Sequence, residues 1–68
     1  MKWEAHSNMV EKRHYMIDFD PSVGYYFYVF DRDQCVQDYL QDTLELAITL
    51  AWEDFGVSKN AWKQIENR

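Results

Sequence analysis

The stretch QDTLELAITLAWEDFG, residues 41–56, decides the fold, because its start, its periodicity and its end all predict one amphipathic helix. Asp42 can cap the amides of the first turn, and Glu45 has the spacing of a capping box. Apolar residues recur at intervals of three and four and therefore share one face: Leu44, Ala47, Ile48, Ala51 and Phe55. Gly56 suits the left-handed residue that ends such helices. We expect this apolar face to pack on a sheet.

Three stretches before this helix predict antiparallel strands. In Arg13–Asp20, apolar and polar side chains alternate, which is typical of a half-buried strand. The segment Asp20–Gly24 has turn chemistry, and Gly24 can adopt the positive φ of a hairpin loop. Tyr25–Phe30 is apolar or aromatic at every position, so both of its faces need at least partial cover. We expect it at the centre of the sheet, with Cys35–Asp38 as a short third strand.

The two ends of the chain complete the predicted fold. Lys2–His6 alternates weakly and would suit a short edge strand. After the helix, Ser58 can cap a short helical turn over residues 59–66. We therefore predict one domain, residues 1–68, of the α+β class. It has an antiparallel sheet of three to four strands, one main helix packed on one face and a short C-terminal helical turn.

Composition and charge narrow the function classes. The chain has 68 residues, including three Trp, five Tyr and four Phe, and such a small domain needs a core dense in large side chains. We expect it to fold without a cofactor. The formal net charge is −5, and Lys and Arg cluster only at Lys12-Arg13, so we do not expect the lone chain to bind nucleic acid. An acidic surface would suit a basic partner.

Cys35 is the single cysteine, so neither an internal disulfide nor a multi-cysteine metal site can form. This indicates a reducing compartment. The N-terminal residues contain no apolar run typical of a signal peptide, and no stretch has the length of a membrane span. We expect a cytoplasmic protein with no membrane association.

A family resemblance covers residues 13–55. Five features follow one another along these residues: a strand, a turn with glycine, a second strand ending in aspartate, a short strand with Cys-Val and an Asp-Thr-Leu-Glu helix start. The segments are Tyr15–Asp20, Gly24, Tyr25–Asp31, Cys35-Val36, and Asp42–Glu45 with Ala47. In this order they resemble the N-terminal domain of HicB-type antitoxins. The resemblance implies a ββ(β)α fold that dimerises or covers a partner protein, without catalysis.

The chain departs from this family in two places. Arg32-Asp33-Gln34 stands where the family has a Pro-Gly turn, and Asp38–Gln41 is inserted before the helix start. The family also commonly carries a C-terminal DNA-binding segment that these 68 residues lack, so we do not transfer operator binding.

The candidate site is an aromatic protein interface. Tyr26, Tyr28 and Phe30 share one face of their strand, and such an apolar patch on a small protein is typical of a contact with another protein. We add Trp3 to this interface. Two alternatives stay open. The N-terminal segment, through Trp3, Met9 and Val10, would cover the patch within the chain, or a homodimer would bury it.

Catalytic alternatives carry less weight. His14 and Asp18 lie on one strand face, and with nearby acids they would suit a small metal-dependent hydrolase. No metal-ligand motif is present, so we predict no metal. Cys35 could be a nucleophile with His14 as its base, but the sequence indicates no third group that would orient the base. We predict a non-enzymatic protein-binding domain, antitoxin- or immunity-like, that forms a homodimer or masks a partner.

Overall fold

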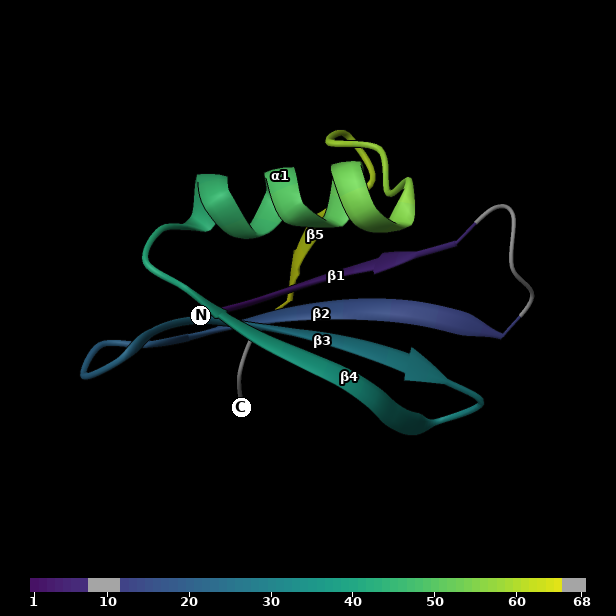
Figure 1. Cartoon of the computed structure of the whole chain (residues 1–68), viewed down its shortest axis with the longest axis horizontal. Coiled ribbons are helices and arrows are strands. Elements are labelled where there is room, and N and C mark those ends of the chain that lie inside the picture. The colour runs from purple at the N-terminus through teal and green to yellow at the C-terminus, as the bar shows by residue number, and fades with distance from the viewer. Residues whose placement is uncertain (8–11, 66–68) are drawn as a thin grey trace.

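A computed structural model describes residues 1–7 and 12–65, and its strands form one antiparallel sheet. The elements are β1 (Lys2–His6), β2 (Arg13–Asp20), β3 (Gly24–Asp31), β4 (Gln34–Gln41), α1 (Leu44–Phe55) and β5 (Lys63–Ile65). The sheet order is β4-β3-β2-β1-β5, and α1 lies across one face of it (Figure 1). The helix therefore joins one edge strand of the sheet, β4, to the other, β5.

The predicted fold class, an α+β domain with three to four strands and a C-terminal helical turn, is wrong. The sheet has five strands, and Lys63–Ile65 forms β5, which pairs with Lys2–Glu4 of β1. This pairing gives partners to backbone groups of β1 that would otherwise form an open sheet edge. A single helical turn would instead have required a costly nucleus for few hydrogen bonds. The fold is mainly β, and β1 is an interior strand, not an edge.

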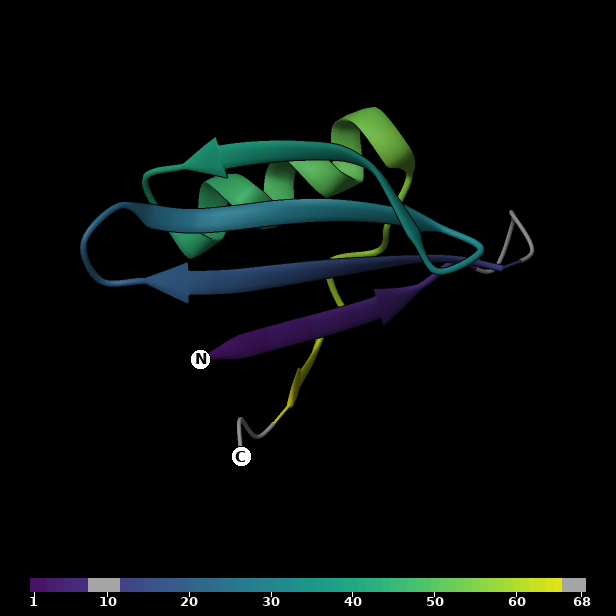
Figure 2. The ribbon, with the colours of Figure 1, turned by 90° about the horizontal axis from the view of Figure 1, so that it is seen from below.

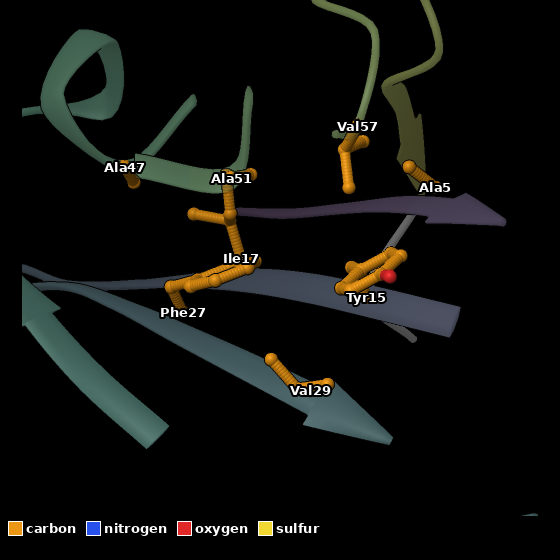
Figure 3. Close-up of a cluster of buried hydrophobic side chains, with 8 residues drawn as sticks. All are labelled: Ala5, Tyr15, Ile17, Phe27, Val29, Ala47, Ala51 and Val57. Carbon is orange, nitrogen blue, oxygen red and sulfur yellow. The ribbon is translucent and has the colours of Figure 1, made fainter. Parts of the chain in front are cut away.

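The core lies between α1 and the sheet face that α1 covers, which we call the covered face. Tyr15 and Ile17 of β2 and Phe27 and Val29 of β3 are each no more than 1% exposed. The buried cluster, drawn in Figure 3, is Ala5, Tyr15, Ile17, Phe27, Val29, Ala47, Ala51 and Val57. The helix contributes only alanines to the fully buried set, so its backbone can approach the sheet closely. Phe55 adds an edge-on contact to Phe27, with ring centroids 5.7 Å apart.

The hairpin between β2 and β3 has the predicted turn chemistry. The Asp20 carboxylate accepts a hydrogen bond from the Ser22 amide at 2.8 Å, and the Asp20 carbonyl accepts one from Val23 at 3.1 Å. Gly24 has φ = 137°, a conformation that side chains disfavour. A Cβ at this position would lie 2.7 Å from the carbonyl oxygen of Gln41. Gly24 therefore permits both the turn and the close approach of β4.

The helix starts one residue later than a cap at Asp42 would place it. Thr43 is the N-cap, with an extended backbone, and its hydroxyl accepts a hydrogen bond from the Leu46 amide at 3.1 Å. Glu45 is consequently in the second helical position, one short of the capping-box position. Both Asp42 and Thr43 are good capping residues, so the local sequence does not choose between them. The Thr43 cap leaves Leu44 as the first helical residue, partly buried against the core.

The end of the helix confirms the prediction for Gly56. This residue has φ = 69°, and its amide donates to the Trp52 carbonyl at 3.1 Å. Val57 donates to the Ala51 carbonyl at 3.1 Å and is 5% exposed. The chain thus turns back onto the core at the helix end, which directs it toward β1, with which β5 pairs.

The cap assignment predicts unequal effects of two neighbouring substitutions. Thr43→Ala should lower the free energy of unfolding by about 1 kcal/mol, because the first turn loses a side-chain acceptor. Asp42→Ala, the matched control, should change it by less than half as much. Urea denaturation followed by circular dichroism measures both. A larger loss in Asp42→Ala than in Thr43→Ala would contradict the Thr43 cap.

The two glycines predict a second comparison. Gly56→Ala should cost about 1 kcal/mol of folding free energy, because a left-handed alanine is strained while its Cβ meets no atom within 4 Å. Gly24→Ala should cost about 3 kcal/mol, because strain and a clash with the β4 backbone combine. The same urea titrations measure the difference. Equal losses in the two variants would show that the contact with Gln41 does not constrain Gly24.

Candidate functional site

The second face of the sheet, which we call the open face, carries the aromatic residues that the sequence selects. Successive side chains of a strand point to opposite faces, and Phe27 and Val29 of β3 are buried under α1. The residues between and beside them therefore lie on the open face: Tyr26, Tyr28 and Phe30. Figure 2 looks onto this face, with α1 behind the sheet. In residues 1–7 and 12–65, no helix or strand lies over it.

The three aromatic rings, which we call the aromatic stripe, contact one another along β3. The centroids of Tyr26 and Tyr28 are 6.0 Å apart with nearly parallel rings, and those of Tyr28 and Phe30 are 6.2 Å apart. Phe30 is also stacked on the His14 ring, at 4.7 Å and an interplanar angle of 5°. All three stripe residues are half-buried. Their mutual packing already limits the freedom of these side chains, so ordering them on binding a partner would cost little conformational entropy.

A carboxylate lies on each side of the aromatic stripe. Asp38 of β4 pairs directly with Tyr28, and Asp18 of β2 pairs with Tyr26. Desolvation by burial, followed by the nearby charge of Asp18, raises the pKa of the Tyr28 hydroxyl above its ordinary value. Tyr26, Asp38 and Cys35 add to this shift. The centre of the open face is therefore an apolar strip in a negative environment.

Two further apolar residues widen the stripe. Met16 of β2 pairs with Tyr28, and Leu40 of β4 pairs with Tyr26, so both share its face. Leu40 is 47% exposed, which is high for a large aliphatic side chain in a strand. Sequence analysis missed both residues as interface candidates. Only the pairing register of the strands identifies them, because they lie on other strands and their places in the sequence do not show that they are opposite Tyr26 and Tyr28.

The structure separates Trp3 from the other predicted interface residues. Trp3 pairs with Ile17, which is fully buried, and its ring lies 6.1 Å from that of Tyr25. It is therefore on the covered face, packed against the core. Trp3 cannot cover the aromatic stripe within the chain. Met9 and Val10, the other residues of that alternative, lie outside the described residues.

The structure does not bring the candidate catalytic groups together. His14 and Asp18 share the open face but are four residues apart on β2, which corresponds to roughly 13 Å along a strand. Cys35 and His14 are both opposite Phe30, on β4 and β2, so roughly 10 Å of sheet separates them. In the described part of the chain, no three His, Cys, Asp or Glu side chains form a group that could hold a metal ion.

The environment of Tyr28 predicts an alkaline loss of stability. Its folded-state pKa is raised, so above pH ~10 the unfolded chain releases this proton before the folded chain does. The free energy of unfolding should therefore fall as pH rises through that range. The free energy of unfolding of Tyr28→Phe should fall less steeply with pH. Urea titrations at successive alkaline pH values measure the two slopes. Parallel slopes in the two proteins would contradict the raised pKa.

Comparison with known proteins identifies no relative of this chain. No family model, no curated protein and no solved structure matches the chain. The resemblance to HicB-type antitoxins therefore stays a prediction from the quoted residues. Across residues 1–7 and 12–65, none of the helical structure has both the length and the apolar character needed to cross a bilayer.

Proposed function

We propose that the chain is a small non-enzymatic protein-binding domain that masks a basic partner protein with its open face, in the manner of antitoxin and immunity proteins. One observation carries this proposal. An aromatic stripe lies on a sheet face that no described element covers, and a carboxylate flanks it on each side.

The chemistry of the stripe indicates what the partner should present. Tyrosine, phenylalanine and methionine are enriched at protein interfaces, where they bury large apolar areas. Asp18 and Asp38 can accept charge-assisted hydrogen bonds from arginine or lysine. A cation placed between them would also lie over the tyrosine rings, where it gains a cation–π interaction. The best-suited partner surface is an arginine or lysine surrounded by apolar side chains.

A second copy of the chain suits the open face less well. A two-fold axis would place the stripe of one copy against the same stripe of the other. Asp18 and Asp38 of the two copies would then approach one another, and each copy has a formal net charge of −5. Like charges in contact oppose association. A homodimer, which the sequence also suggested, is therefore the competing outcome in the experiment below.

We also propose the cytoplasm as the compartment of this activity. Cys35 is a free, exposed thiol, and exposed thiols persist in reducing compartments. The hydrolase alternative has no support in the geometry, because His14 and Asp18 lie too far apart along β2 to share one ion.

The test combines partner capture with purified components. Tagged wild-type chain would be used to capture proteins from its native cytoplasm, and each basic protein recovered would be purified and titrated by calorimetry. We expect one basic partner to bind, with at least tenfold weaker binding to Tyr28→Glu, because a charge then replaces the central ring. Trp52→Glu is the matched control. Trp52 is 51% exposed on α1, which packs against the covered face, so this variant should bind normally.

A second variant separates the two kinds of partner without disturbing the stripe. The double substitution Asp18→Asn with Asp38→Asn removes the flanking charges. It should therefore weaken the binding of a basic partner, whereas it would tighten the association of a homodimer. Sedimentation equilibrium gives the oligomeric state of the chain alone. A dimer that Tyr28→Glu dissociates and the double variant strengthens would overturn the proposed basic partner. Normal partner binding by Tyr28→Glu, folded by circular dichroism, would overturn the open face as the interface.

A further inference from the structure

A hollow of about 350 Å³ lies at one end of the sheet, apart from the centre of the aromatic stripe. The turn between β3 and β4 and the adjoining ends of β1 and β2 are at this end of the sheet (Figure 1, Figure 2). The side chains that matter for its chemistry are His6, Lys12, Arg13, His14, Arg32 and Asp33. They come from three separate segments of the chain.

The hollow concentrates positive charge on an acidic protein. Among the residues that the structure describes, three of the seven Lys and Arg residues of the chain line it, and Asp33 is the one acidic residue that does. His6 and His14 have ring centroids 5.7 Å apart, and each imidazole offers an N–H donor in either protonation state. The lining is therefore rich in hydrogen-bond donors and has an excess of cations, which is the chemistry of an anion site.

Backbone and side-chain contacts join the segments that carry the three cations. The Arg32 amide donates to the Lys12 carbonyl at 3.0 Å, which ties the β3–β4 turn to the start of β2. A terminal nitrogen of Arg13 lies 3.6 Å from the Asp31 carboxylate. The buried Nε of Arg13 finds no hydrogen-bond partner among the described residues. Arg13 shares a face of β2 with the buried Tyr15, whereas His6 and His14 lie on the other face, so the Arg13 guanidinium does not share a face with the imidazoles.

The backbone around the hollow has a positive φ at three residues that are not glycine. The described non-glycine residues with positive φ are Lys12 at 64°, Arg32 at 53° and Asp33 at 68°, and all three line the hollow. A two-residue hairpin turn with both φ values positive favours Asn-Gly, not Arg-Asp. Strained positions of this kind cluster at functional sites. The charged side chains are therefore placed here against the local conformational preference.

From these observations we infer that the hollow binds a phosphate group. A phosphate presents several acceptor oxygens and up to two negative charges, which match the Arg32 guanidinium, the Lys12 ammonium and the imidazole donors among the residues that line the hollow. The site meets the end of the aromatic stripe at His14, which is stacked on Phe30, but its cations lie at the end of the sheet and can be tested without the proposed protein partner. Its ligand is either free inorganic phosphate or the phosphate of a small monoester.

Titration of the full chain distinguishes these sources. Inorganic phosphate, O-phosphoserine and acetate would be added separately at low ionic strength, with binding followed by two-dimensional NMR of the backbone and the arginine Nε groups. We expect saturable shifts at the hollow residues and the Arg32 Nε with phosphate or phosphoserine. The tighter of the two identifies the ligand as the free or the esterified group. If acetate binds as tightly as both inorganic phosphate and O-phosphoserine, the assignment to phosphate is overturned.

Three variants separate binding from folding. Arg32→Asn should weaken phosphate binding about tenfold or more without lowering the melting temperature, because one charged donor is lost and asparagine tolerates positive φ well. Asp33→Gly should tighten binding and raise the melting temperature, because it removes the opposing charge and the strain. Lys59→Asn removes an exposed cation that does not line the hollow and should leave binding unchanged.

Several outcomes would overturn the site. Equal weakening by Arg32→Asn and Lys59→Asn would show only a general charge effect. Unsaturated shifts at every phosphate concentration, or binding to Asp33→Gly no tighter than to wild type, would also reject it. Because Asp33→Gly is expected to stabilise the fold, this variant keeps the test decisive even if Arg32→Asn is poorly folded.

Discussion

The packing of α1 on the covered face is the contact on which the rest of the structure depends. Ala47 and Ala51 bring the helix close to Ile17 and Phe27, and each large side chain buried there contributes about 2 kcal/mol to folding. The same helix connects the two edge strands of the sheet, so its position also determines where β5 pairs. A single helix can cover only one face. For this reason, no helix or strand in the described part of the chain covers the aromatic stripe of β3.

The two proposed binding surfaces use different chemistry and meet at one residue. The open face offers apolar rings between carboxylates, which suits a cation in an apolar setting. The hollow offers cations and imidazoles, which suits an anion. His14 belongs to both, because its ring is stacked on Phe30 and also lines the hollow. A molecule bound in the hollow would therefore contact the end of the stripe.

The two hairpin turns on either side of β3 contrast in how well they suit their conformations. The β2–β3 turn has an aspartate that accepts from Ser22, a proline and a glycine where φ is 137°. The β3–β4 turn places Arg32 and Asp33 at positive φ, where glycine or asparagine would be more stable. The second turn lines a hollow with an excess of cations among its described residues. The difference supports a role in binding for the second turn and a purely architectural one for the first.

Periodicity and capping in the sequence by themselves determined the α1 helix, the β2–β3 hairpin and the residues that share a face with Tyr28, because these features depend on neighbours in the chain. The choice of Thr43 over Asp42 as cap required the position of Leu44 against the core. The β5 strand, the place of Trp3 on the covered face and the convergence of His6, Lys12 and Arg32 required the tertiary structure. The physical reason is that backbone hydrogen bonds between strands carry no sequence signal. Pairing partners far apart in the chain are set by where the helix delivers them and by which register buries the apolar face.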